Sequence, residues 1–242
     1  MSSLPDYFGG AFVINLKERT DRRRAAEAEF RKLGWKGVEV FPAFKFEEAA
    51  GFPFSSWRGC FHSHLGCLKA AHNSKLDSVL IFEDDIALSS RIPFFTPQIV
   101  SVLDETEWDL VYFGHAPGDI AHASRNTSGV TFVDAGSNEI HETHFYAVNK
   151  RIIPRLIEHF YRNAETVPHD GNFGPMPVDG AYNTFRRFNS DVITLVTNPK
   201  LGWQRPSRSD ISPKKIDGIR LLRPILTYGR RCKSLIYRLS RY

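Results

Sequence analysis

The sequence Val79-Leu80-Ile81-Phe82-Glu83-Asp84-Asp85 decides the fold, because a short apolar run ends there in three consecutive carboxylates. Four apolar residues bounded by polar ones are typical of a strand that is covered on both faces. Ligands of open α/β sheets bind beyond the carboxyl ends of such strands. Carboxylates at that edge repel one another unless a cation joins them, and their oxygens favour Mg²⁺ or Mn²⁺. The alternative is a solvated exit from strand to loop.

Strands and helices alternate around this run. Helices are expected after the possible caps Thr20 and Asp21, across 61–73, after Pro154 and across 181–188, whereas 198–215 reads as loop. Short apolar runs predict further strands at residues 11–16, 38–41, 109–114, 145–148 and 192–196. The pattern predicts one α/β domain over residues 1–213, with a mixed, mostly parallel sheet and helices on both faces.

The charge of the chain is concentrated at one end. Among 242 residues with a net charge of +5, residues 214–242 hold nine Lys and Arg against Asp217, so this tail carries +8 and residues 1–213 carry −3. A mildly acidic body argues against a nucleic-acid groove. Apolar residues recur in the tail at steps of three and four, which predicts a basic amphipathic helix that docks on an anionic membrane surface. The alternative is a helix packed on the body.

Cysteines and apolar runs indicate where the protein works. The three cysteines lack the paired spacing of a zinc site and the density of a secreted disulfide scaffold. No basic segment followed by an apolar one opens the chain, and eighteen apolar residues never run together. A reducing cytoplasm, without signal peptide or spanning helix, is therefore expected.

Two polar segments lie near predicted helix starts. At the end of the first strand, Asn15 and Arg19 are placed to meet a nucleotide at a helix N-terminus, although no P-loop or dinucleotide fingerprint occurs. Solvated arginines at a helix start are the alternative. In the second segment, Cys60 with a nearby histidine offers a nucleophile and a base. A close-packed turn whose Ser63 and His64 reach a ligand is the favoured interpretation.

Two later segments carry further candidates. Asp179 follows a loop rich in Gly and Pro and begins a helix, so it is placed to act as a base toward a substrate hydroxyl. A helix N-cap is the competing role for an aspartate there. The polar loop that starts at Gln204 carries Arg205 and Arg208, which are suited to close over phosphates. An ordinary surface loop is the alternative.

Taken together and in this order, the segments resemble glycosyltransferase family 25, the enzymes of lipooligosaccharide and lipopolysaccharide biosynthesis. The likeness covers roughly residues 11–210 and rests on five motifs: Phe12-Val13-Ile14-Asn15-Leu16 with Arg19 and Asp21-Arg22-Arg23; Gly59-Cys60 with Ser63-His64; Leu80-Ile81-Phe82-Glu83-Asp84-Asp85; His144-Phe145-Tyr146-Ala147-Val148; and Pro177-Val178-Asp179. Gly180 departs from the pattern, because related members carry another acid there.

The resemblance implies a GT-A-type nucleotide-sugar fold, inverting transfer, Mn²⁺ or Mg²⁺, and UDP-galactose as the donor. It also implies a glycan or glycolipid acceptor such as a lipopolysaccharide core, reached from the cytoplasmic face of a bacterial inner membrane. The roles expected for this chain are metal binding by Glu83 and Asp85, donor binding by Asn15, Arg19, Ser63, His64, Glu83, Asp84 and Gln204, and base catalysis by Asp179.

Two other functions compete with sugar transfer. A metal-dependent phosphoesterase also uses clustered carboxylates and histidines, although only one acidic cluster is evident in the sequence. A non-catalytic carbohydrate-binding protein at the membrane surface would keep the fold without the chemistry, and the departure at Gly180 allows that interpretation.

Overall fold

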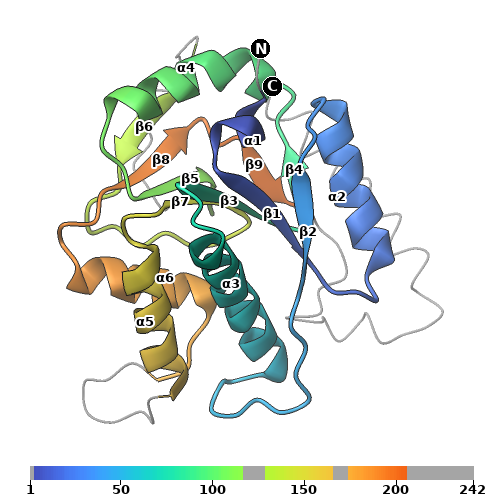
Figure 1. The fold of residues 1–242 in the computed structure, drawn as a ribbon, viewed down its shortest axis with the longest axis vertical. Helices are drawn as coiled ribbons and strands as arrows, with labels where there is room; N and C mark the ends of the chain where they lie inside the picture. Colours follow the sequence, from blue (N-terminus) through green and yellow to red (C-terminus); the bar gives the residue numbers. More distant parts are fainter. Residues whose placement is uncertain (1–2, 117–128, 166–173, 206–242) are drawn as a thin grey trace.

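A central seven-stranded sheet organises the computed structural model, which describes residues 3–116, 129–165 and 174–205 (Figure 1). The strand order is β2-β1-β3-β7-β5-β8-β6, and a separate pair, β4-β9, lies beside it. The strands are β1 (Gly10–Asn15), β2 (Val38–Pro42), β3 (Ser78–Glu83), β4 (Ile86–Leu88), β5 (Leu110–Gly114), β6 (Thr131–Asp134), β7 (Phe145–Asn149), β8 (Thr194–Asn198) and β9 (Gly202–Gln204).

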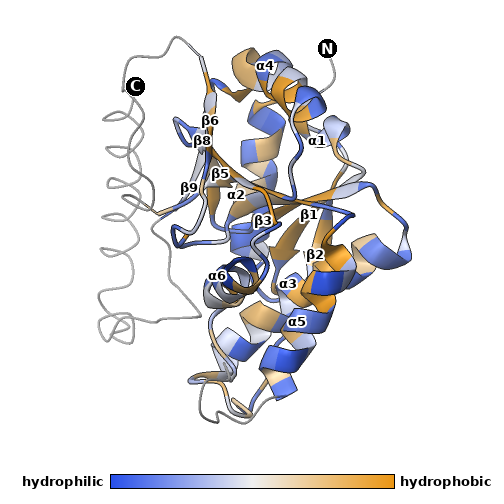
Figure 2. Cartoon of the chain, turned by 90° about the vertical axis from the view of Figure 1, so that its left-hand side faces the viewer, coloured by the Kyte–Doolittle hydropathy of each residue, from blue (hydrophilic) through white to orange (hydrophobic). Residues whose placement is uncertain are grey.

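Helices cover both faces of the sheet, as the sequence predicts. Side chains of β3 alternate between two apolar clusters, with Val79 and Ile81 in one and Leu80 and Phe82 in the other. Figure 2 shows hydrophobic residues gathered in the central strands. The helices α3 (Ser55–Asn73), α5 (Ile153–Glu165) and α6 (Val178–Phe188) join the first cluster, and α1 (Leu4–Tyr7), α2 (Thr20–Lys32) and α4 (Ile92–Glu105) join the second.

The expectation of a mostly parallel sheet is wrong. The pairs β1–β2, β1–β3 and β5–β8 are parallel, whereas β3–β7, β5–β7 and β6–β8 are antiparallel. The apolar run at 145–148 forms a strand as predicted, but β7 enters between β3 and β5 in the opposite direction. A fully apolar run fits a buried strand of either direction, so the pattern does not determine strand orientation.

Several element bounds also differ from the predictions. Helix α2 begins at Thr20 with Arg19 at the N-cap position, so Thr20 and Asp21 lie in its first turn rather than capping it. The helix expected at 61–73 begins at Ser55, so the supposed turn at 58–64 is helical. The stretch 198–205, expected to be loop, contains β9. Helix α4 and strands β4 and β6 had no predicted counterpart.

Glycine at position 59 permits this longer helix to pack against the loop before it. A Cβ atom at Gly59 would lie 2.7 Å from the carbonyl oxygen of Phe44, which no side chain tolerates without a shift of backbone. The loop at 43–47 is fixed there by a hydrogen bond from the Phe44 N–H to Ser63 Oγ, 2.9 Å. Close approach of helix and loop therefore depends on the missing side chain.

The carboxyl ends of β1 and β3 meet at one edge of the sheet. The two strands are parallel, with Ile14 opposite Glu83, so Asn15 and Asp84 follow side by side. Strand β9 pairs with β4 and places Gln204 opposite Ile86. This edge holds the candidate site.

Some predictions lie outside the described residues: the basic helix at 214–242, Arg208, and most of the loops at 115–130 and 168–177. Among the helices that the structure describes, none has the length and apolar character needed to cross a membrane.

The substitution Gly59→Ala tests the close approach of α3 to the loop. Alanine normally stabilises a helix relative to glycine by roughly 0.5–1 kcal/mol, but here we expect a loss of roughly 1–3 kcal/mol from overpacking, measured by urea unfolding. Gly180→Ala in α6 is the matched control, because its Cβ would meet only the flexible Met176 side chain, at 3.3 Å from the sulfur. A stabilised Gly59→Ala protein would contradict the packing argument.

Candidate functional site

Three carboxylates lie in the turn where β3 ends and β4 begins. Glu83 is the last residue of β3, and Asp84 and Asp85 connect it to β4. Their side chains are only 15%, 9% and 14% exposed, so water cannot supply most of their hydrogen bonds. Each carboxylate must find its partners within the protein or in a ligand.

Asp84 is fully engaged by the protein. Asn15 donates from Nδ2 to Oδ2 at 2.7 Å, and Arg22 donates from Nη1 to Oδ1 at 2.8 Å. Burial raises the pKa of Asp84, and the Arg22 guanidinium and the Asn15 amide act in the opposite direction without cancelling the shift. Asp84 therefore organises the turn and has little capacity left for another ligand.

Asp85 is the carboxylate with a free oxygen. Its Oδ1 is buried and has no hydrogen-bond partner, and its Oδ2 lies 3.5 Å from Arg22 Nη2. Burial raises the pKa of Asp85 to about 7, and the neighbouring Glu83 charge adds to the rise. The backbone of the turn is fixed by Arg205, whose Nη2 donates to the Asp84 carbonyl at 2.9 Å and whose N–H donates to the Asp85 carbonyl at 2.7 Å.

Glu83 accepts hydrogen bonds from the segment before β7 and from β9. Thr143 donates from Oγ1 to Oε1 at 3.1 Å, and Gln204 donates from Nε2 to Oε2 at 3.3 Å. His64 Nε2 lies 3.6 Å from Oε1. Burial acts to raise the pKa of Glu83, but His64, His144 and Thr143 together bring it below the ordinary value. Glu83 is thus the ionised member of the pair that it forms with Asp85.

A buried chain of polar side chains extends from His64 to α6. His64 Nδ1 is 2.7 Å from the Tyr146 hydroxyl, which is 2.9 Å from the Tyr182 hydroxyl. All three side chains are fully buried. The hydrogen bond at Nδ1 fixes the orientation of the His64 ring and directs Nε2 toward Glu83.

A cavity of about 340 Å³ opens beside the acidic turn. Its walls come from the end of β1, the loop at 43–47, the first turns of α3 and the acidic turn itself. The volume lies within the range of small-ligand sites. Charged, aromatic and metal-ligating side chains share its lining, among them Arg22, Phe44, Phe46, Cys60, His64 and Glu83.

The structure brings most of the predicted site residues to this edge. Asn15, His64, Glu83, Asp84 and Gln204 meet at or next to the acidic turn. Two others, Arg19 and Ser63, make hydrogen bonds or ion pairs within the protein.

Arg19 pairs through Nε with Asp21 Oδ1 at 2.9 Å. The Ser63 hydroxyl donates to the Gly59 carbonyl at 2.6 Å and accepts from the Phe44 N–H, so it joins α3 to the loop at 43–47. Ser63 also lines the cavity.

Asp179 lies in the first turn of α6, after the N-cap residue Pro177, so it is not the N-cap. Its Oδ1 accepts a hydrogen bond from the Gly180 N–H at 2.9 Å, and its Oδ2 lies 3.8 Å from His141 Nδ1. The charges of Asp179 and of the acidic turn both act on the Cys60 thiol. Burial raises the pKa of this thiol, and Glu83, Asp179, Asp85 and Asp84 raise it further, which disfavours the thiolate that a cysteine nucleophile needs.

Sequence reasoning missed three residues that complete the site: Arg22, Thr143 and Tyr146. Arg22 follows Asn15 by seven residues within the quoted opening motif, and its charge next to an acidic strand end was the available signal. Thr143 and Tyr146 reach the site because β7 is antiparallel to β3, with Phe82 opposite Phe145. No sequence pattern gives that pairing.

The raised pKa of Asp85 predicts how stability depends on pH. Between about pH 4 and pH 7 the folded metal-free protein keeps a proton on Asp85 that the unfolded chain has released, so stability falls as the pH rises through this window. Asp85→Asn removes that loss, and we expect the variant to exceed the wild type at about pH 8 by roughly 1–3 kcal/mol.

Urea unfolding across this pH range, with a chelator present, measures the difference. It should disappear near pH 4. Asp77→Asn is the control, because Asp77 lies just before the other end of β3 with its side chain 80% exposed. Identical pH profiles for wild type and Asp85→Asn would contradict the assignment.

Comparison with known proteins shows which family this chain resembles. Residues 55–171 match the family model described as Glycosyltransferase family 25 (LPS biosynthesis protein). This segment includes Ser63, His64 and the acidic turn, whereas Asn15, Asp179 and Gln204 lie outside it. A solved glycosyltransferase involved in glycosylation of the PBCV-1 major capsid superposes with a TM-score of 0.39 at 13% identity, over 78% of this chain and 93% of that one, a likeness too low to define the fold.

Curated relatives match over about half of this chain. A "Glycosyltransferase 25 family member" of Drosophila pseudoobscura pseudoobscura is 33% identical over 43% of this chain and 20% of its own length. Procollagen galactosyltransferase 2 of Mus musculus is 27% identical over 47% and 23%, and "Inactive glycosyltransferase 25 family member 3" of Homo sapiens is 26% identical over 44% and 22%. The matches thus span about a fifth of these longer relatives. The resemblance drawn from the sequence is confirmed: residues 55–171, slightly under half of this chain, match glycosyltransferase family 25.

Proposed function

We propose that this protein transfers a hexose, with galactose the first candidate, from a UDP-sugar to a hydroxyl of a glycan or glycolipid acceptor, with inversion at the anomeric carbon. The observation that carries the proposal is the buried pair of Glu83 and Asp85 beside a 340 Å³ cavity, with Asp85 Oδ1 lacking a partner. The family match supports the same chemistry. We also propose that the fold is of the GT-A type.

The donor set at the acidic turn fits a hard divalent cation. Glu83 and Asp85 offer carboxylate oxygens, which Mg²⁺ and Mn²⁺ prefer. Burial raises the pKa of Asp85, and the charge of Glu83 raises it further; a cation beside the two carboxylates would favour the ionised form of both. When bound, such an ion would stabilise the negative charge that develops on the departing diphosphate. Asp84 lines the cavity as well, but each of its oxygens already accepts one hydrogen bond, from Asn15 or from Arg22, so Glu83 and Asp85 are the proposed metal ligands.

The cavity walls offer separate features to a nucleotide sugar. Phe44 and Phe46 lie with their rings nearly parallel, 6.3 Å apart between centroids, and form an apolar wall that suits a flat base or the face of a sugar. Arg22 lines the cavity while it holds Asp84, so its positive charge is fixed next to the acidic turn. Binding energy from these walls would hold the sugar against the reacting groups.

Asp179 is the proposed base. Direct displacement requires a group that removes the proton from the acceptor hydroxyl as the new bond forms, and a carboxylate does this from hydrogen-bond distance. Its Oδ1 is held by the Gly180 N–H, and its side chain is 28% exposed, which leaves Oδ2 accessible to an acceptor. The Asp179 charge acts on the same Cys60 thiol as the acidic turn does.

The acceptor and the location in the cell stay predictions from the sequence. The family model names lipopolysaccharide biosynthesis, and several relatives are named procollagen galactosyltransferases, so both acceptor classes belong in an activity assay. A cytoplasmic position at a bacterial inner membrane is the location we propose.

Donor binding is the first test of the proposed function. We expect UDP and UDP-galactose to raise the melting temperature and to give binding heat in calorimetry with Mn²⁺, and Asp85→Asn to weaken binding at least tenfold because a ligand oxygen is lost. Asp77→Asn should bind as the wild type does. Absence of UDP binding under all conditions would refute the nucleotide-sugar proposal, and phosphodiester hydrolysis would favour a phosphoesterase.

Turnover tests the base. We expect Asp179→Asn to lower kcat by roughly 10²–10⁴-fold, the usual contribution of general base catalysis, while UDP binding stays within about twofold. Asp191→Asn, at an exposed carboxylate paired with Arg155, is the control. Loss of UDP binding in a folded Asp179→Asn protein would remove Asp179 from this role. Binding without turnover by the wild type, on lipopolysaccharide-core and procollagen acceptors alike, would indicate a non-catalytic member.

A further inference from the structure

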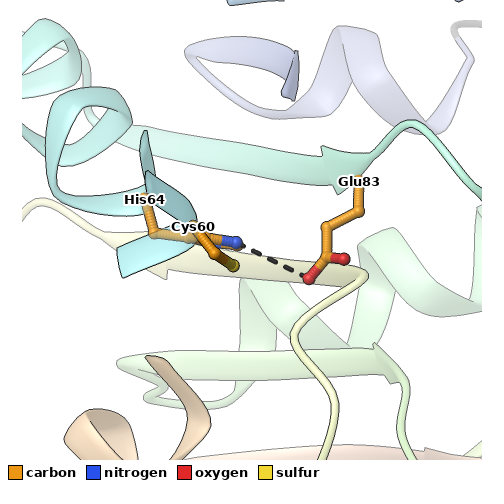
Figure 3. A group of neighbouring side chains, drawn as sticks. All are labelled: Cys60, His64 and Glu83. Carbon is orange, nitrogen blue, oxygen red and sulfur yellow. Dashed lines mark ion pairs between the residues drawn. The ribbon is translucent and has the colours of Figure 1, made fainter. Parts of the chain in front are cut away.

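Cys60, His64 and Glu83 converge on one point beside the acidic turn (Figure 3). Cys60 and His64 are four residues apart on α3, so their side chains lie on one face of the helix. Glu83 reaches the same point from the end of β3. One sulfur, one nitrogen and one oxygen from these residues all lie within 4.8 Å of one another.

The histidine in this group makes no hydrogen bond at the nitrogen that faces the other two, where its polar neighbour is Glu83 Oε1 at 3.6 Å. His64 is fully buried, and Nε2 makes no hydrogen bond. A buried polar atom without a hydrogen bond is unfavourable, and a ligand at this point would satisfy it. The other nitrogen, Nδ1, is held by the Tyr146 hydroxyl at 2.7 Å. Metal-ligating histidines show this arrangement, with one nitrogen fixed by a neighbour and the other directed at the ion.

The distances suit a small tetrahedral ion. Bond lengths of about 2.0–2.2 Å from zinc to nitrogen and oxygen place two such ligands about 3.3 Å apart in a tetrahedral site. His64 Nε2 and Glu83 Oε1 are 3.6 Å apart, so small side-chain adjustments close the site. All three residues line the cavity, which leaves a fourth position accessible to water or a ligand.

We propose that Cys60, His64 and Glu83 form a transition-metal site of the zinc type, distinct in chemistry from the oxygen-ligand site of Glu83 and Asp85. Sulfur and imidazole nitrogen favour Zn²⁺ over Mg²⁺ and Mn²⁺. Binding forms a metal–sulfur bond and releases the thiol proton to solvent. Glu83 takes part in both sites, so zinc competes there with the hard cation of the proposed function. The zinc site itself does not rest on that function.

Cobalt titration of the full-length, chelator-treated protein tests the site without any nucleotide sugar. A thiolate bound to Co²⁺ gives a near-ultraviolet charge-transfer band that oxygen and nitrogen ligands do not give. We expect this band in the wild type, its loss on addition of Zn²⁺, and its persistence with excess Mg²⁺. Cys60→Ala should lack the band. Cys67→Ala should keep it, because Cys67 is a buried cysteine of the same helix that packs in the apolar core.

Further variants distinguish this site from the proposed site of Glu83 and Asp85. Asp85→Asn should keep the band, which distinguishes this site from the one that the donor-binding test examines. Calorimetry with Zn²⁺ should show at least tenfold weaker binding by Cys60→Ala and, through the unfixed His64 ring, by Tyr146→Phe. Circular dichroism checks that each variant is folded. A wild type without the band, or a folded Cys60→Ala protein that keeps it, would overturn the proposal.

Discussion

The ion pair between Arg22 and Asp84, completed by the Asn15 amide, is the interaction on which the edge of the sheet depends. Three adjacent carboxylates at the end of a buried strand are unfavourable both because they lose water and because they repel one another. The protein satisfies the middle one completely, with hydrogen bonds of 2.7 and 2.8 Å from two side chains. Of the flanking carboxylates, Glu83 lines the cavity, and Asp85 keeps one buried oxygen without a hydrogen-bond partner.

Stability is therefore distributed unevenly within one turn. Burial raises the pKa of both Asp84 and Asp85, so the charge of each opposes folding in the absence of a cation, but only Asp84 gains hydrogen bonds from Asn15 and Arg22 that offset part of this cost. A site that is kept at such a cost is typical of function rather than of packing. The buried, unpartnered Nε2 of His64 is a second cost of the same kind. Both costs lie next to the cavity, and bound cations would relieve both.

The sequence predicted the strands that are buried on both faces, because a run such as 79–82 has no competing periodicity. It also predicted strands that end near Asn15 and at Glu83, and the structure pairs these two strands in parallel, so that Asn15 contacts Asp84. It did not predict α4, whose Pro97 interrupts the helical signal, or the direction of β7, which depends on pairing far along the chain.

The contacts of Glu83 with Thr143 and Gln204 were unpredictable for the same reason, since they join segments 60 and 121 residues apart. Gln204 was proposed as a donor-binding residue only through the family resemblance. A spacing of four residues on a helix would have indicated that Cys60 and His64 can bind one metal ion, but the sequence pattern predicts a turn there. An error in a helix boundary thus hid a constellation of side chains.

Closure of the acidic turn by Arg205 has a consequence for the order of folding. The carbonyl groups of Asp84 and Asp85 receive their hydrogen bonds from a residue 120 positions later, and β3 receives β7 only after 60 further residues are made. Contacts of such long range form slowly, because the chain loses the entropy of closing a large loop before it gains the energy of the contacts. During synthesis the N-terminal half can pair β1, β2 and β3, while the acidic edge stays unfinished until the last described strand arrives. Assembly of the acidic edge is in this way a late event that follows the pairing of β4 with β9.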